Sequence, residues 1–191
     1  GNDIVAVRQA ATEAIETARK ANDMMAEEVA KRPDRFRCFA ALPMQDVEAA
    51  VGELNRCVKE LGFVGALVNG FTQKDVADSA VYFDIPEYRP FWAVMEELGV
   101  PFYLHPRTQI AARLQPYEDH PWLFSAAWGF AREASIHALR LIGSGLFDDH
   151  PGLQIILGHL GERIPYDMWR LDHRIRKIPN GYPCKKEMGD Y

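Results

Sequence analysis

The chain has 191 residues and a formal net charge of −5, with 48% hydrophobic and 26% charged residues. This is the composition of a globular protein with one sizeable core. The acidic balance argues against nucleic acid or an anionic membrane as the main partner, and no apolar run approaches the roughly 20 residues of a membrane span. The three cysteines, Cys38, Cys57 and Cys184, are widely spaced, which predicts reduced thiols and a cytoplasmic location.

Four elements are predicted in the first third of the chain. Apolar residues recur at helical spacing over 7–30, and a short apolar run over 37–42 predicts a buried strand. Asp46 is a good N-cap for a second helix, which Gly62 ends. The run over 63–68 is apolar almost without interruption, which predicts a strand buried on both faces, as in a parallel sheet.

The second half of the chain continues this alternation. Its predicted elements are, in order, a helix over 90–98, a strand over 101–105, a helix over 124–147, a strand over 153–158 and a helix from Pro165. The polar loop over 107–122 is long for a compact domain, which predicts a functional loop.

Strict alternation of helices with short apolar strands predicts parallel βα units, with the strands in sequential spatial order. Four strands are too few to close a barrel. The pattern fits either a small open sheet or the middle of an eight-stranded barrel. We expect the second: residues 1–191 form a single domain, the central portion of a (β/α)8 barrel whose N-terminal and C-terminal strands are absent.

The strand ends carry the candidate chemistry, because active sites of parallel α/β folds form outside the carboxyl ends of the strands. Asn69, His105 and His159 occupy such ends. An imidazole there can ligate a metal or move a proton near neutral pH. Glu162 can accept the imidazole N–H of His159 and fix its tautomer. We predict that the two histidines share a cavity, whereas His137 is buried in helix packing.

A single histidine after a strand is more often a loop residue than a ligand, and it is the equivalent placement of the two that favours function. No P-loop, GxGxxG after a strand or GxSxG elbow is present. Aromatic side chains are frequent in the loops. They fit a core or an interface, and they fit equally a pocket for a flat aromatic substrate.

The segments 101–107 (PFYLHPR) and 157–162 (LGHLGE) resemble the metal-dependent decarboxylase branch of the amidohydrolase superfamily. Further agreement over 33–36, 62–70, 144–148 and 165–174 extends the resemblance to essentially the whole chain. It implies an amidohydrolase-type (β/α)8 TIM barrel, of which this chain supplies about four central βα units, the third to sixth. It also implies a carboxy-lyase that removes the carboxyl group of a hydroxylated benzoate, of the 2,6-dihydroxybenzoate type, non-oxidatively and reversibly.

The resemblance further implies a divalent metal cofactor, Zn²⁺ or Mn²⁺. The roles that it implies are metal ligand for His105, catalytic residues for His159, Glu162 and Arg170, and substrate-binding residues for Asn69 and Phe130. The family's other ligands, a Glu-x-His pair on the first strand and an aspartate on the eighth, have no counterpart here. We therefore expect that this chain alone neither binds a divalent metal tightly nor decarboxylates a substrate.

The expected partner is a small aromatic carboxylate. Members of the family are commonly dimers or tetramers, so the resemblance also implies a homodimer or homotetramer. Two other hypotheses stay open. One is a metal-dependent hydrolase of the same superfamily, in which a metal-activated water attacks a lactone or amide. The other is a catalytically inactive fragment that only binds or assembles. The aromatic-rich loops and the closeness of the motif match favour the decarboxylase.

Overall fold

The computed structural model describes residues 2–74 and 79–191 of the chain. Its sheet has three parallel strands in sequential order, β1 (Ala66–Asn69), β2 (Phe102–His105) and β3 (Ile155–Leu157). The parallel direction and the sequential order of these strands confirm the prediction from the alternating pattern.

The predicted strand over 37–42 is wrong in extent. Its place beside β1 is kept by a single parallel bridge from Ala40 to Ala66. The Ala40 amide donates to the Gly65 carbonyl at 2.8 Å, and the Leu67 amide donates to the Ala40 carbonyl at 3.0 Å. The Val64 amide also donates to the Cys38 carbonyl at 3.0 Å, and Pro43 closes the apolar run. It lies where a fourth parallel strand would lie.

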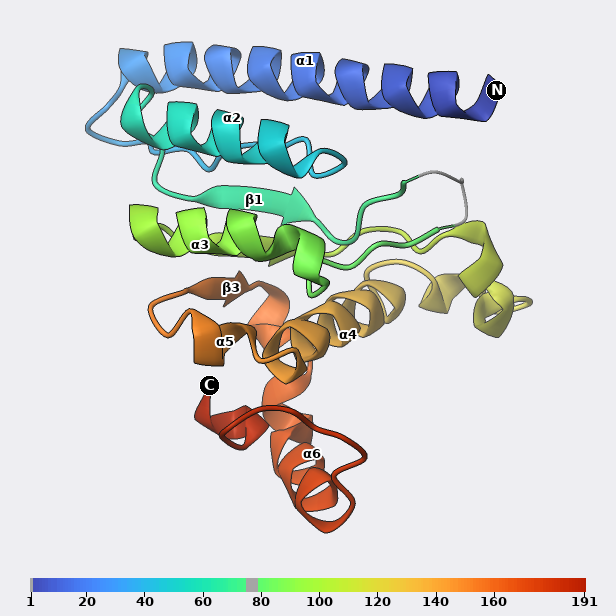
Figure 1. Cartoon of the computed structure of the whole chain (residues 1–191). Coiled ribbons are helices and arrows are strands. Elements are labelled where there is room, and N and C mark those ends of the chain that lie inside the picture. Colours follow the sequence, from blue (N-terminus) through green and yellow to red (C-terminus); the bar gives the residue numbers. More distant parts are fainter. Residues whose placement is uncertain (1, 75–78) are drawn as a thin grey trace.

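Six α-helices were found in the described residues. They are α1 (Asn2–Lys31), α2 (Val47–Lys59), α3 (Arg89–Leu98), α4 (Gly129–Gly143), α5 (Leu146–Asp149) and α6 (Ile164–Lys177). α2 packs against both α1 and α3, and α1 and α6 lie at opposite ends of the molecule (Figure 1). None of the described helices is both long and apolar enough to cross a membrane.

The helix ends follow the local signals in the sequence. Asp46 caps α2 by accepting a hydrogen bond from the Ala49 amide at 2.9 Å, as predicted. Gly99 ends α3 in the left-handed region with a φ of 63°. The single helix predicted over 124–147 is wrong, because Gly145 adopts a φ of 77° and separates α4 from α5. At the other end, α4 begins only at Gly129.

The core lies on one face of the sheet. Ala66, Val68, Phe102 and Leu104 alternate along β1 and β2 and are buried. The ring of Trp92, on α3, lies 4.9 Å from that of Phe102, edge to face. Burying a side chain of this size contributes about 1.5–3 kcal/mol.

The opposite face of the sheet is only partly covered. Leu67 and Tyr103 are half-buried and Asn69 is exposed. The prediction that the strand over 63–68 is buried on both faces is therefore wrong for β1, since the described helices cover one face of the sheet and leave the other partly open. Apolar side chains on the open face would suit the packed interior of a barrel.

Glycine is required at two points of this partly covered face. A Cβ on Gly65 would lie 2.2 Å from the Phe39 ring and 2.7 Å from the Pro101 carbonyl oxygen. A Cβ on Gly158 would lie 2.1 Å from the Tyr103 hydroxyl. The missing side chains leave room for the rings of Phe39 and Tyr103, whose centroids lie 6.4 Å apart.

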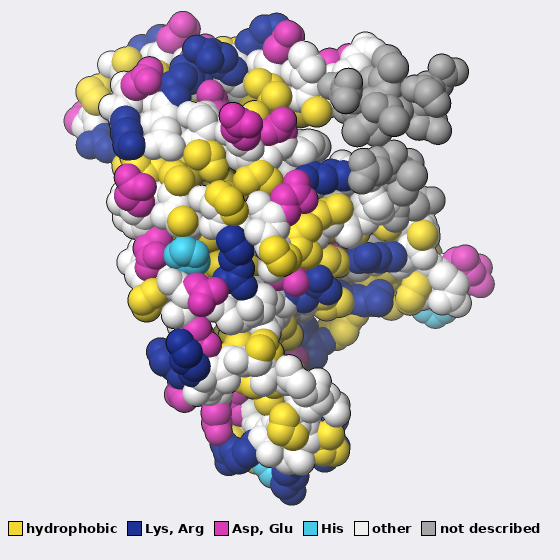
Figure 2. Space-filling model, in the orientation of Figure 1, with side chains coloured by type: hydrophobic (Ala, Val, Ile, Leu, Met, Phe, Trp, Pro, Cys, Tyr) yellow, Lys and Arg dark blue, Asp and Glu magenta, His cyan; other side chains and the backbone are white. Residues whose placement is uncertain are grey.

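The surface mixes charges of both signs. Figure 2 shows Lys and Arg interspersed with Asp and Glu over the visible face, with no continuous basic patch there. The three cysteines are free thiols. Burial, followed by the nearby Glu53, raises the pKa of the Cys57 thiol to about 12, so this buried cysteine is an inert core residue.

Candidate active site at the strand ends

His105 and Asn69 lie side by side at the carboxyl end of the sheet. They are the last residues of β2 and β1 and are directly paired in the register, and side chains at paired positions point to the same face. The Nδ1 atom of His105 lies 2.9 Å from the Pro106 carbonyl oxygen. Because a carbonyl only accepts, Nδ1 carries the proton and Nε2 keeps a free lone pair, which is the form that ligates metals.

His159 begins an unusual turn that follows β3. Five consecutive residues, 159–163, have φ values of 48°, 60°, 77°, 50° and 71°. Only the central residue, Gly161, adopts this left-handed conformation without strain, since it costs a non-glycine residue roughly 1–3 kcal/mol. Leu160 is 89% exposed, so apolar burial does not hold the turn in this shape.

The turn places the Glu162 carboxylate under the His159 ring. Oε1 of Glu162 lies 2.5 Å from Nδ1 of His159, and the Glu162 side chain is only 2% exposed. The hydrogen bond fixes the tautomer of His159 and leaves its Nε2 free, as predicted from the spacing of the two residues.

The rings of His105 and His159 contact each other. Their centroids lie 5.5 Å apart, at an interplanar angle of 65°. The His105 ring also lies 6.1 Å from the ring of Tyr103, two residues earlier on the same face of β2. The two histidines therefore lie together as predicted, whereas a cavity shared by both stays a prediction. Tyr103 is a neighbour that the sequence pattern did not single out.

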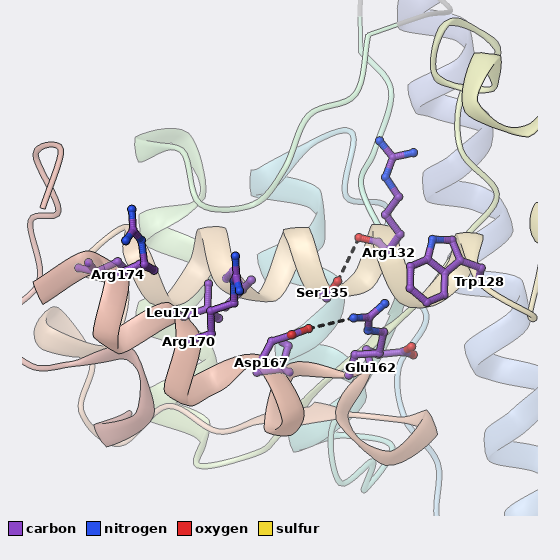
Figure 3. A pocket seen from close by; sticks show the side chains of 12 residues that line it. Trp128, Arg132, Ser135, Glu162, Asp167, Arg170, Leu171 and Arg174 are labelled. Carbon is purple, nitrogen blue, oxygen red and sulfur yellow. Dashed lines mark hydrogen bonds and ion pairs between the residues drawn. The ribbon is translucent and has the colours of Figure 1, made fainter. Parts of the chain in front are cut away.

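Arg170 and Phe130 are less closely joined to this pair. Arg170 shares with Glu162 a cavity of about 390 Å³ between α4 and α6. Figure 3 shows Glu162 at the end of this cavity near Trp128, and Arg170 farther along α6. Phe130 lies in the first turn of α4. Among the described residues, no hydrogen bond or ring contact joins Arg170 or Phe130 to either histidine.

His137 is a core residue, as predicted. It is fully buried, and its Nε2 accepts the Phe83 amide at 3.0 Å. Burial, together with the charge of Arg140, lowers the pKa of His137 to about 3. The ring is therefore neutral at physiological pH and packs edge to face against Tyr82 at 4.9 Å.

A second buried polar cluster lies under the long loop, and the sequence did not reveal it. The Tyr82 hydroxyl donates to the buried Glu133 carboxylate and accepts from Arg113. Burial, followed by the bond to Glu133, raises the pKa of Tyr82 to about 12. These residues join the loop to α4, and their separation of 51 positions between Tyr82 and Glu133 leaves no local signal.

The metal-binding capacity of the site is partial. His105 offers one suitable nitrogen, but no group of three or more His, Cys, Asp or Glu in the part of the chain that the structure describes could hold a metal ion. Catalytic metal sites use about three protein ligands and a water. His105 is therefore a suitable metal ligand, but the described residues do not supply enough further ligands to complete the coordination of a metal ion.

The fold is that of a parallel α/β protein with two histidines in contact at the carboxyl ends of its strands. A family model described as amidohydrolase matches residues 2–184, and the chain belongs to this family. It is 59% identical over 180 residues to the gamma-resorcylate decarboxylase of Rhizobium sp. (strain MTP-10005), covering 93% of this chain and 55% of that protein.

Other relatives agree. The gamma-resorcylate decarboxylase of Rhodococcus jostii (strain RHA1) is 60% identical, with 93% of this chain and 56% of that protein covered. A crystal structure of 2,6-dihydroxybenzoate decarboxylase complexed with 2,6-dihydroxybenzoate matches with a TM-score of 0.92 and 57% identity, over 95% of this chain and 56% of that one. The chain thus spans about half the length of these relatives, and it forms part of an amidohydrolase-type TIM barrel.

One further solved structure bears on the metal. The dihydroxybenzoic acid decarboxylase of Polaromonas sp. JS666, with bound manganese and the inhibitor 2-nitroresorcinol, matches with a TM-score of 0.91 and 56% identity. The match covers 95% of this chain and 55% of that one.

Proposed function

We propose that this chain is the central part of a metal-dependent decarboxylase that acts on a hydroxylated benzoate of the 2,6-dihydroxybenzoate type. The observation that carries the proposal is the contact between His105 and His159 at the strand ends, with Glu162 bound to the far nitrogen of His159. The relatives named above support decarboxylation of an aromatic acid over hydrolysis of a lactone or amide.

In this proposal the described residues divide the work. His105 would donate Nε2 to Mn²⁺ or Zn²⁺, and the ligands that complete the site would come from strands outside this chain. The metal, when bound, would supply a positive charge that orients the carboxylate and an ortho hydroxyl of the substrate. Asn69 and Phe130 would contact the aromatic ring.

His159 would give or take a proton at Nε2 while Glu162 holds Nδ1 and stabilises the protonated ring. Arg170 would support this pair from the far side of the cavity that it shares with Glu162. Protonation of the ring carbon that bears the carboxyl group disrupts aromaticity, and carbon dioxide then leaves. The donor of that proton is not assigned to a residue of this chain.

We further propose that residues 1–191 fold as one domain, and that the protein works in the cytoplasm as a homodimer or homotetramer without nucleic acid or membrane partners. Three free thiols suit a reducing compartment. Three large side chains on and before α6, Leu160, Tyr166 and Trp169, are 89%, 84% and 76% exposed, which suits an interface. Analytical ultracentrifugation tests the assembly, and a purely monomeric protein would contradict it.

The function is tested by carbon dioxide release from 2,6-dihydroxybenzoate, 2,3-dihydroxybenzoate and salicylate, with and without added Mn²⁺ or Zn²⁺. We expect release, greatest with 2,6-dihydroxybenzoate, from a protein that carries the remaining barrel strands. We expect neither release nor micromolar metal binding by calorimetry from the 191-residue chain alone. No release by the longer protein, or equal release with and without the metal, would contradict the proposal.

A further inference from the structure

A small polar cavity lies beside the candidate site. Its volume is about 230 Å³, and it opens between the end of β1 and the segment that bridges to it. Its polar side chains are those of Gln45, Asn69, Thr72 and Arg107. Asn69 is also the register neighbour of His105, so the cavity and the histidine site share one wall.

The guanidinium of Arg107 is held in a fixed orientation at this cavity. It stacks on the Phe71 ring at 4.4 Å, donates to the Phe71 carbonyl at 2.9 Å and donates to Gln73 Oε1 at 3.2 Å. Its stem crosses Gly70, where a Cβ would lie 2.6 Å from Arg107 Cγ. Gly70 also has a φ of 59°. The backbone is thus built to let this side chain pass.

No carboxylate among the described residues forms an ion pair with Arg107, and the charge of Glu133 acts on it only at longer range. Three other arginines do form such ion pairs. Arg56 pairs with Asp23 and Glu53, Arg89 pairs with Asp149, and Arg140 pairs with Asp84. A half-buried guanidinium loses hydration, and that loss is recovered when an oxygen ligand binds it. Two of its five N–H groups are used by protein acceptors, and the others remain to bind such a ligand.

We propose that this cavity is a specificity subsite, in which Arg107 binds an oxygen substituent on the aromatic ring of the substrate. The planar fork of an arginine suits a phenolate or carboxylate oxygen. Neighbouring strands lie about 4.8 Å apart, so a substrate ring held at His105 would also lie beside Asn69, its register partner on β1. A second ortho oxygen, one that does not face His105, can then reach the Arg107 cavity. This inference rests on the proposed function, because it assumes an aromatic acid at the histidine site.

The test measures binding selectivity on the metal-free chain, so that it does not depend on turnover. Ligand-observed NMR would give the relative affinities of 2,6-dihydroxybenzoate and 2-hydroxybenzoate, which differ by the second hydroxyl. We expect a preference for the dihydroxy acid of about 10-fold or more, the usual effect of one charge-assisted hydrogen bond. Arg107→Met, which keeps the stem, should abolish the preference. Arg107→Lys should retain part of it, since it keeps the charge and loses the fork.

Arg35→Met serves as the matched control, because Arg35 is exposed and lies outside the cavity. It should leave the preference unchanged. An intact preference in Arg107→Met overturns the inference, and so does the absence of binding by the unaltered chain. If Arg107→Met does not fold by circular dichroism, a full preference in Arg107→Lys overturns it instead. Failure to release carbon dioxide, with an Arg107-dependent preference preserved, would count against the proposed function and leave the subsite standing.

Discussion

The helix-covered face of the sheet and the rim at its carboxyl end differ in burial and in backbone conformation. On the covered face, Phe102 and His137 are fully buried. The Nε2 atom of His137 accepts a hydrogen bond from the Phe83 amide, and burial strongly lowers the pKa of this histidine. At the rim, His159 is half-exposed, pairs with a buried carboxylate and stands in a turn of left-handed residues. The covered face stabilises the fold, whereas the rim carries backbone strain in the turn that brings Glu162 to His159.

The largest expected effect is the loss of a core ring. Phe102→Ala should lower the free energy of unfolding by about 3–5 kcal/mol, because it removes buried apolar area and leaves a cavity. Urea denaturation followed by circular dichroism measures this. The matched control is Tyr103→Ala, on the partly covered face of the same strand, which should cost less than half as much. Equal losses would erase the distinction between the two faces.

At the rim, Glu162→Gln should change chemistry rather than folding. In a protein that carries the remaining strands, we expect turnover to fall about 10- to 100-fold, since the amide orients His159 without stabilising its protonated form. Metal content, measured by mass spectrometry, should be unchanged. Complete metal loss in this variant would make Glu162 a ligand and overturn its assignment as the partner of His159.

The pH dependence of stability separates the buried histidine from the others. The folded-state pKa of His137 is about 3, below the unfolded value of about 6.5. The folded state therefore binds fewer protons, and its stability should fall as the pH drops from about 6.5 towards 3, by up to about 1.4 kcal/mol per unit. His137→Gln, which keeps an acceptor for the Phe83 amide, should flatten the slope between pH 6.5 and 5, whereas His120→Gln should not.

The smallest expected effect has the opposite sign. Leu160→Gly should raise the free energy of unfolding by about 0.5–1 kcal/mol, because glycine adopts a positive φ without the strain, less its own entropy cost. The control, Ile136→Gly on the exposed side of α4, should lower stability by about 1 kcal/mol. A loss at both positions in thermal unfolding would show that the turn stores no strain.

Local signals predicted what is locally determined. Asp46 and Gly99 lie at helix ends as expected. The equivalent positions of His105 and His159 at the ends of their strands predicted that the two rings lie together. Errors arose where tertiary context decides. Gly145 divides a helix whose apolar period runs on without a break. The segment at Ala40 pairs by one bridge, because pairing depends on a neighbouring strand.

The surroundings of the site were the least predictable part. The left-handed turn over 159–163 contains one glycine, so four of its five residues carry no sign of their conformation. The contact of Glu133 with Tyr82 joins positions far apart in the chain. Arg107 stands two residues after His105 and could have been singled out by that spacing, but its contact with Phe71 depends on the path of another loop.

In the proposed function, a metal binds at the rim and not at the covered face. The direct test is a titration of the chain with Mn²⁺, followed by NMR of ring-labelled histidines, since the paramagnetic ion broadens signals of nearby rings even when it binds weakly. We expect His105 and His159 to lose intensity at lower Mn²⁺ concentrations than the other four of the six histidines. Equal broadening of all six, or earlier broadening of any of the others, would contradict it.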